Sequence, residues 1–216
     1  DTDPNLYEDC ILENGENRGD AYSVVHIREY GNASVPASPT HIYRRSHVVG
    51  QIAALGSQDI SGGYAHVRAE NCTLVARNAF SATPLSNAAA FTLSGSCTGR
   101  IRFVSDGCIQ YGQNWTGVPA AGSACANKYE FSGGFGEKTP LHCLGMPYLL
   151  AEGADAYRNQ LASVAKAQDI HGNALFGAGY DIGCQEHQGD NSVYADRYKP
   201  GRSAGAFPLI NPWIVR

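Results

Sequence analysis

The sequence predicts an α+β fold in which a β-dominant, antiparallel sheet carries one clear helix and is stabilised by disulfides. Three observations lead to this prediction. Short segments rich in β-branched and aromatic residues alternate with Gly, Ser, Asn and Asp turns. One stretch, over residues 150–168, has the apolar spacing of three or four residues that is typical of a helix. Seven cysteines are spread along the chain without a Cys-x-x-Cys pair, which favours disulfides over a zinc site.

The strands come first in the chain, after an acidic arm over residues 1–19. Strands are predicted over residues 21–30, 41–43, 64–68, 72–77, 91–93, 100–105, 108–111 and 129–131. The apolar stretch 48–55 fits either a strand or a short helix, and the Ala-rich stretch 78–90 has helical character on either side of Pro84. In the segment 100–105, Arg100 and Arg102 are expected on one face and Ile101 and Val104 nearer the other, as in a half-exposed strand.

After the helix over 150–168, the C-terminal part is predicted to be mostly loop, because it contains many glycines and prolines. Gly172 is a candidate left-handed cap after the helix, and the apolar residues 207–215 are expected to dock on the body of the protein. We find no internal repeat and no long linker. With 216 residues, 43% of them hydrophobic, the chain is therefore predicted to form a single domain over residues 1–216.

Several features favour a secreted, extracellular glycoprotein. No run approaches the roughly 18 consecutive apolar residues that span a bilayer, so no membrane span is expected. The chain opens at Asp1 rather than at Met, which fits a mature chain without its signal peptide. Glycosylation sequons begin at Asn32, Asn71 and Asn114. Disulfides persist in oxidising compartments, and the odd number of cysteines leaves one unpaired; which one, and how the others pair, stays open.

The motifs of the common enzyme classes are missing from the sequence. It has no Gly-x-Ser-x-Gly elbow, no phosphate-binding Gly-x-x-x-x-Gly-Lys-Ser/Thr loop, no His-Glu-x-x-His helix, no EF-hand loop and no dinucleotide fingerprint. The formal net charge of -4 is also not that of a basic nucleic-acid coat protein. Ordinary hydrolases, kinases and dehydrogenases therefore have no support in the sequence.

One region resembles a known family. The segment 41–51 contains Arg-Arg-Ser-His, and it is followed by the segment 70–78, which ends in Ala-Arg-Asn, and by Thr-Pro-Leu-Ser-Asn over 83–87. This order of strand, loop and asparagine-bearing segment resembles the His-Me finger (ββα-metal) non-specific DNA/RNA endonucleases. The likeness covers about 50 of the 216 residues, and the family's usual Asp-Arg-Gly-His is here Arg-Arg-Ser-His.

The resemblance implies a metal-dependent nuclease that hydrolyses phosphodiester bonds of a nucleic acid. It implies that His47 is the general base for water, that Asn78 or Asn87 holds a hydrated Mg²⁺ or another divalent cation, and that Arg44, Arg45 or Arg77 contacts the phosphate. This chemistry is coherent, because a neutral imidazole can accept a proton from water and a divalent cation can stabilise the charge that develops on phosphate.

Other interpretations stay open beside the nuclease. His47 beside two valines is also typical of a half-buried histidine, and Asn78 and Asn87 of turn or cap residues. The residues 181–191 hold carboxylates, an imidazole and an amide that could bind a cation, but a Gly-rich solvated loop is the favoured interpretation. Low charge with many Gly, Ala, Ser and Tyr residues also fits a non-enzymatic extracellular subunit that is structural, adhesive or carbohydrate-binding, with self-assembly or a glycan as its partner.

Overall fold

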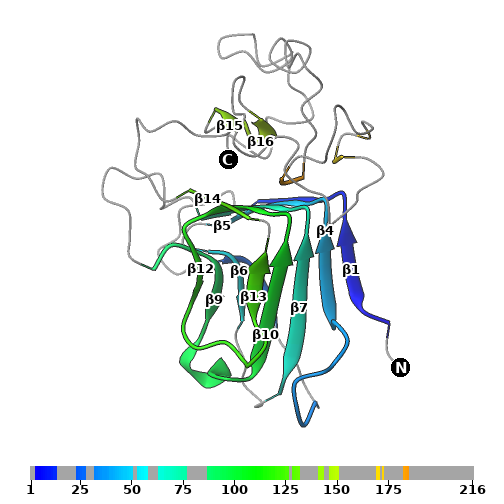
Figure 1. The fold of residues 1–216 in the computed structure, drawn as a ribbon, viewed down its shortest axis with the longest axis vertical. Helices are drawn as coiled ribbons and strands as arrows, with labels where there is room; N and C mark the ends of the chain where they lie inside the picture. Colours follow the sequence, from blue (N-terminus) through cyan, green and yellow to red (C-terminus); the bar gives the residue numbers. More distant parts are fainter. Residues whose placement is uncertain are drawn as a thin grey trace.

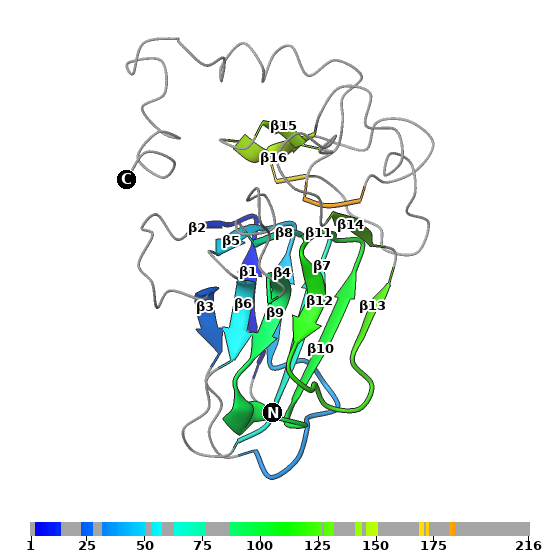
Figure 2. The same ribbon diagram turned by 90° about the vertical axis from the view of Figure 1, so that its left-hand side faces the viewer.

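The computed structural model describes residues 3–13, 23–27, 32–50, 53–57, 63–76, 87–126, 128–131, 141–143, 146–150, 169–170, 172 and 182–184. Three parallel sheets make up most of this part of the chain. Sheet A holds β1 (Asn5–Glu8), β4 (His41–Arg44), β7 (Ala65–Glu70), β10 (Ile101–Asp106) and β13 (Ala124–Ala126), side by side in Figure 1. Sheet B holds β2 (Ile11–Glu13), β5 (His47–Gly50), β8 (Thr73–Ala76), β11 (Ile109–Tyr111) and β14 (Tyr129–Phe131). Sheet C holds β3 (Ser23–Ile27), β6 (Ala53–Ser57), β9 (Ala89–Leu93) and β12 (Gln113–Thr116), which Figure 2 shows in front.

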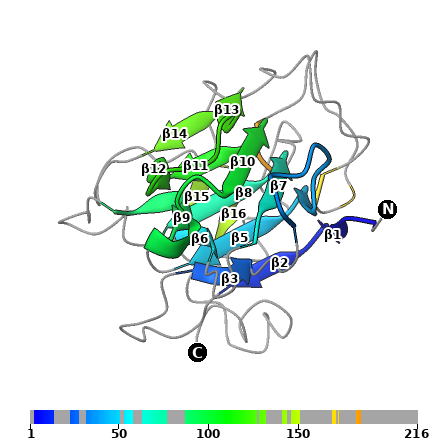
Figure 3. The same ribbon diagram turned by 90° about the horizontal axis from the view of Figure 1, so that it is seen from below.

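The chain visits the three sheets in turn, and this order defines a parallel β-helix. Each coil runs from a strand of sheet A to one of sheet B and then to one of sheet C, and the next coil stacks on it in parallel register, as seen from below in Figure 3. Asn5 pairs with His41, and His41 with Val67. Neighbouring coils thus contact each other as the repeats of a solenoid do.

The core lies inside the coils, where every second residue of a strand points. In β10 the side chains alternate between buried and partly exposed from Ile101 to Asp106. Tyr7 stacks on Tyr43 with ring centroids 4.9 Å apart, and Phe91 of sheet C stacks on Phe103 of sheet A at 4.8 Å. These stacks fill the interior across adjacent coils and across facing sheets.

The predicted fold class is wrong in its sheet and in its disulfides. All pairs in sheets A, B and C are parallel, and the antiparallel pair among the described residues is β15 (Leu141–Cys143) with β16 (Met146–Leu150). Short alternating segments occur in both sheet types, so alternation cannot tell them apart. The six cysteines whose side chains the structure describes are free thiols: Cys10, Cys72, Cys97, Cys108, Cys125 and Cys184.

The structure also differs from the expected mixture of strand and helix. Within the described ranges, the helical element is one 3-10 turn, η2 (Gly95–Cys97). The predicted helix over 150–168 falls outside the described residues, apart from Leu150, which ends β16. Of the acidic arm, Asn5–Glu8 and Ile11–Glu13 form the first two strands of the β-helix. No helix in the part of the chain that the structure describes has the length and apolar character needed to cross a membrane.

Candidate functional site

The turn from sheet A to sheet B recurs in successive coils at the place where the nuclease motif was expected. Four residues occupy equivalent positions in this turn: Asp9, Arg45, Asn71 and Gly107. They are 36, 26 and 36 residues apart, and all four have a positive φ, between 44° and 66°. A left-handed residue at this point lets the chain leave one sheet and enter the next within two residues. The Arg-Arg-Ser-His segment is therefore a β-helix corner.

The residue after each left-handed position anchors the corner. Cys10, Ser46, Cys72 and Cys108 fill this position, and each donates its S–H or O–H to the carbonyl two residues earlier, at 2.9 to 3.5 Å. Two of the four also accept an N–H from the preceding coil: Ser46 Oγ from Cys10 at 3.1 Å, and Cys108 Sγ from Cys72 at 3.4 Å. These residues form a ladder of corner hydrogen bonds, which we call the corner ladder.

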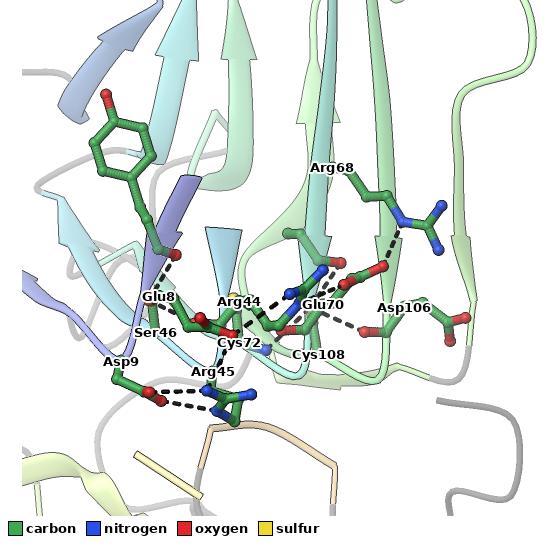
Figure 4. Close-up of polar contacts among 12 residues, drawn as sticks. Glu8, Asp9, Arg44, Arg45, Ser46, Arg68, Glu70, Cys72, Asp106 and Cys108 are labelled. Atoms are coloured by element: carbon green, nitrogen blue, oxygen red, sulfur yellow. Dashed lines mark hydrogen bonds and ion pairs between the residues drawn. The ribbon is translucent and has the colours of Figure 1, made fainter. Parts of the chain in front are cut away.

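Beside the corner ladder, two of the three arginines predicted to contact phosphate, Arg44 and Arg45, are held by carboxylates (Figure 4). Arg45 donates two hydrogen bonds to Asp9, both of 2.8 Å, and its Nη2 lies 3.0 Å from Glu8. Arg44 donates its Nε–H to Glu70 at 2.9 Å and reaches Glu8 at 3.5 Å. The pKa of Arg44 is raised mainly by its hydrogen bond to Glu70, and that of Arg45 mainly by its bond to Asp9. Their donors are thus directed at protein carboxylates, not at an external phosphate.

His47 lies inside packed side chains. It is the first residue of β5, is 1% exposed and pairs in register with Thr73 of β8. Its neighbours Val48 and Leu74 belong to the core cluster, so His47 and Thr73 lie on the opposite, outer face of sheet B.

A segment distant in the sequence lies on this outer face. Cys184 donates its N–H and its S–H to Thr73 Oγ1, at 3.4 and 3.2 Å, and Gly183 donates its N–H to the carbonyl of Gly107 at 2.7 Å. Ile182, Gly183 and Cys184 are buried, so this stretch of the predicted loop 181–191 is not solvated. A general base needs access to water and to its substrate, and the burial of His47 withholds both in this arrangement.

The other residues of the predicted nuclease site are Arg77, Asn78 and Asn87. Arg77 and Asn78 fall outside the described residues. Asn87 is exposed at the turn before β9, which belongs to sheet C, whereas His47 belongs to sheet B. Among the described residues, no three His, Cys, Asp or Glu side chains form a group that could hold a metal ion. The role of Mg²⁺ stays a prediction.

The three sequons have different surroundings. Asn71 is 2% exposed and takes the left-handed position of a corner. Asn114 is partly buried, and its Oδ1 accepts a hydrogen bond from Lys128 at 2.5 Å. Asn32 is partly exposed in a loop and donates from Nδ2 to the carbonyl of Tyr64 at 2.9 Å. Asn71 is therefore enclosed by the fold, while Asn32 and Asn114 are both partly exposed.

The outer face of sheet A is where solvent reaches long polar side chains. The outward positions of β7 and β10 hold His66, Arg68, Glu70, Arg102, Val104 and Asp106. Arg68 has a 41% exposed side chain and forms an ion pair with Glu70 at 2.6 Å. The sequence prediction that Arg102 lies on the exposed face of its strand is confirmed, since Ile101 and Phe103 on either side are buried. Val104, which was expected nearer the other face, lies on the same face as Arg102.

Sequence reasoning missed the repeat that builds both the corner and this face. The sequence does contain a pattern that marks the corners: a residue that tolerates positive φ, then a cysteine, then the next strand. It occurs at Asp9-Cys10, Asn71-Cys72 and Gly107-Cys108. Coils of unequal length hide it, because the spacing changes from 36 to 26 residues. Comparison of the chain with protein-family models, with curated proteins and with solved structures found no match.

Proposed function

We propose that this chain is a non-enzymatic, extracellular binding subunit, and that the outer face of sheet A takes an extended glycan. The observation that carries the proposal is the contrast between two sheet faces. On sheet B, the outward residues His47, Thr73 and Ile109 are 0 to 1% exposed. On sheet A, the outward side chains of the three central strands are partly exposed apart from His66, which is 7% exposed.

The stacking of the coils suits a linear polymer. Equivalent outward positions in parallel strands repeat at about 4.8 Å, so sheet A presents rows of side chains along the axis of the β-helix. One row holds Leu6, Ile42, Arg68, Val104 and Ala124, and another holds Glu8, Arg44, Glu70, Asp106 and Ala126. A ligand whose units also repeat along a line can make similar contacts on successive coils.

The apolar surface gives less support to a large protein partner. Among the described residues, the exposed large hydrophobic side chains are Leu6, Ile11 and Val118. Leu6 and Ile11 lie on the first coil, while Val118 follows β12. Protein interfaces are centred on a larger apolar or aromatic cluster, so the described surface favours a polar ligand.

Affinity electrophoresis in gels that contain single polysaccharides tests this function. We expect at least one linear polysaccharide to retard the protein without being shortened, while branched dextran does not retard it. The same preparation is incubated with supercoiled plasmid and Mg²⁺. The proposal is overturned if no gel retards the protein and if the protein cleaves the plasmid whereas the His47→Ala variant does not. That result would favour the nuclease interpretation.

A further inference from the structure

The two ends of the β-helix are formed by strands from the first and the last described coil. In sheets A and B, β1 and β2 form the edge at one end, and β13 and β14 form the edge at the other (Figure 3). All four strands run parallel to their neighbours within the sheet. Because the sheets are parallel, the edge at one end has the strand direction that continues the edge at the other end.

A column of inward-facing residues runs the whole length of sheet A. Its members pair in register from coil to coil: Tyr7, Tyr43, Ala69, Ser105 and Cys125. The three middle residues are 0% exposed, whereas Tyr7 and Cys125 are partly exposed. In sheet B, Leu12 of the first coil is also partly exposed, while Val48 and Leu74 behind it are 0% exposed. The column of sheet A is therefore open to solvent at both of its ends.

We propose that copies of this chain associate head to tail, with the last coil of one copy stacked on the first coil of the next. Strands β13 and β14 of one protomer then pair with β1 and β2 of its partner, so that sheets A and B continue through the contact. A second copy is the occupant because the same chain presents both halves of this contact. The inference goes beyond the proposed function and does not depend on glycan binding.

The backbone of β1 is oriented for this pairing. Asn5 donates its N–H to the carbonyl of Thr40 in the second coil at 2.9 Å. Successive residues of a strand direct their backbone groups to opposite sides, so the N–H of Leu6 points away from β4. Among the described residues, no strand lies on that side of β1. Such edge groups are the ones that the addition of a strand from another chain uses.

The side chains at the two ends are compatible with each other. In the register that continues sheet A, three pairs come together: Leu6 with Ala124, Tyr7 with Cys125, and Glu8 with Ala126. Leu6 is 50% exposed, and the contact buries it beside a small apolar residue. Sulfur packs favourably against an aromatic ring, which suits the second pair. The third pair places a carboxylate beside an alanine, so like charges do not meet.

The proposed contact differs from a twofold dimer in what it builds. It uses a different surface on each copy, so it does not close after two subunits and produces a series of oligomers. A contact between two first coils would instead stop at a dimer. In-register residues of neighbouring strands are about 4.8 Å apart, which lies within the range of Cα separations that a disulfide bridges. Disulfide trapping can therefore identify which ends meet.

Sedimentation velocity over a range of protein concentrations tests the association. The unchanged protein is compared with Leu6→Pro, which removes the N–H at the open edge and leaves the hydrogen bond from Asn5 to the second coil in place. Leu6→Ala is the matched variant that keeps the N–H. Val118→Ala is the control, because it shortens a 59% exposed apolar side chain outside the strands of the contact. Circular dichroism and thermal unfolding show whether each variant is folded.

We expect the average mass of the unchanged protein to rise with concentration beyond that of a dimer. Leu6→Pro should need at least tenfold more protein for the same rise and Leu6→Ala severalfold more, whereas Val118→Ala should change it less than twofold. The proposal is overturned by a protein that stays monomeric up to about 1 mM, by a series that ends at a dimer, or by a folded Leu6→Pro variant that associates as the unchanged protein does.

Disulfide trapping tests the orientation independently of Leu6→Pro. Tyr7→Cys is prepared together with Cys10→Ser, which removes the other partly exposed thiol of the first coil, and is oxidised with copper phenanthroline. We expect a ladder of cross-linked oligomers on non-reducing gels, and we expect Cys125→Ser to abolish it. The protein with Cys10→Ser alone, in which Tyr7 is unchanged, should give no ladder. Cross-linking that persists in the Cys125→Ser variant would show that other surfaces meet and would refute the head-to-tail contact.

Discussion

At the scale of single residues, backbone geometry at the bends of the coil decides what the sequence can tolerate. Gly99 and Gly112 both have positive φ, +70° and +102°. A Cβ on Gly99 would meet no atom within 4 Å, whereas on Gly112 it would lie 2.5 Å from the backbone oxygen of Ala88 in the preceding coil. The two positions separate backbone strain from a steric clash between coils.

Alanine at Gly112 should therefore destabilise the fold far more than alanine at Gly99. We expect Gly99→Ala to lower the free energy of unfolding by about 1 kcal/mol, since only the left-handed conformation is penalised. Gly112→Ala should cost several times as much, because backbone atoms of the preceding coil must move as well. Urea unfolding followed by circular dichroism measures both. Equal losses would mean that adjacent coils do not approach this closely.

Serine should replace cysteine in the corner ladder. Ser46 makes the same contacts in its coil as Cys108 does in its own: a hydrogen bond to the carbonyl two residues earlier, one to a carbonyl of the preceding coil, and one accepted from a backbone N–H. We expect Cys108→Ser to change stability by less than about 1 kcal/mol, and Cys108→Val to cost about 1–3 kcal/mol because buried backbone groups lose a partner. Unfolding in urea under reducing conditions compares the two. A valine variant as stable as the serine variant would contradict the role of the ladder.

At the scale of the elements, the coils are held together by side chains that stack between strands. Phe103 is fully buried and stacks on Phe91 of another sheet. Phe103→Ala should lower the free energy of unfolding by about 3–5 kcal/mol, because it removes a buried ring and leaves a cavity. Leu6→Ala, at a side chain that is 50% exposed on the outer face of sheet A, should cost less than about 1 kcal/mol. Similar losses in chemical denaturation would place the ring of Phe103 outside the core.

Individual strands could be predicted from the sequence, but their partners could not. The alternation in Arg100-Ile101-Arg102 marks β10 and its exposed face correctly, and the segment 129–131 matches β14. The partner of β10 is β7, and Ile101 pairs with Ala65 across 36 residues of sequence. Local periodicity carries no information about pairing over that distance, nor about whether the pair is parallel.

The packing around the candidate site could not be predicted for a related reason. The polar residues beside Val48 and Val49 are compatible with a strand that carries an active site and also with a strand that is covered on both faces. Only tertiary packing decides, and here a segment around Gly183 lies on the outer side of the strands next to His47. The arginines at 44 and 45 likewise could not be recognised as ion-pair partners, because Asp9 and Glu8 come from the preceding coil.

At the scale of the whole molecule, the cysteines should behave as thiols rather than as disulfides. Cys72, Cys97, Cys108 and Cys184 are buried, while Cys10 and Cys125 are partly exposed. Iodoacetamide applied to the native protein should label the two partly exposed thiols within hours and leave the four buried ones unlabelled, because buried thiols are protected from reagents. After denaturation without a reductant all six should react. Peptide mass mapping distinguishes these states, and a disulfide-linked peptide among the six would contradict the structure.

Two buried histidines should make the stability of the whole β-helix depend on pH. Burial lowers the pKa of His41 and that of His66, and for His66 the charges of Arg102 and Arg68 add to this effect. In the unfolded chain both return to about 6.5, so the unfolded state binds more protons once the pH falls below that value. Their neutral forms therefore contribute stability that is complete above about pH 6.5 and is lost as the pH drops towards their folded pKa values, with a slope of at most about 1.4 kcal/mol per pH unit for each group. The urea concentration at the unfolding midpoint should therefore decrease as the pH is lowered from 7.5 to 5.5. In the double variant His41→Gln, His66→Gln this decrease should be smaller. Equal slopes for the variant and the unchanged protein would assign the pH dependence to other groups.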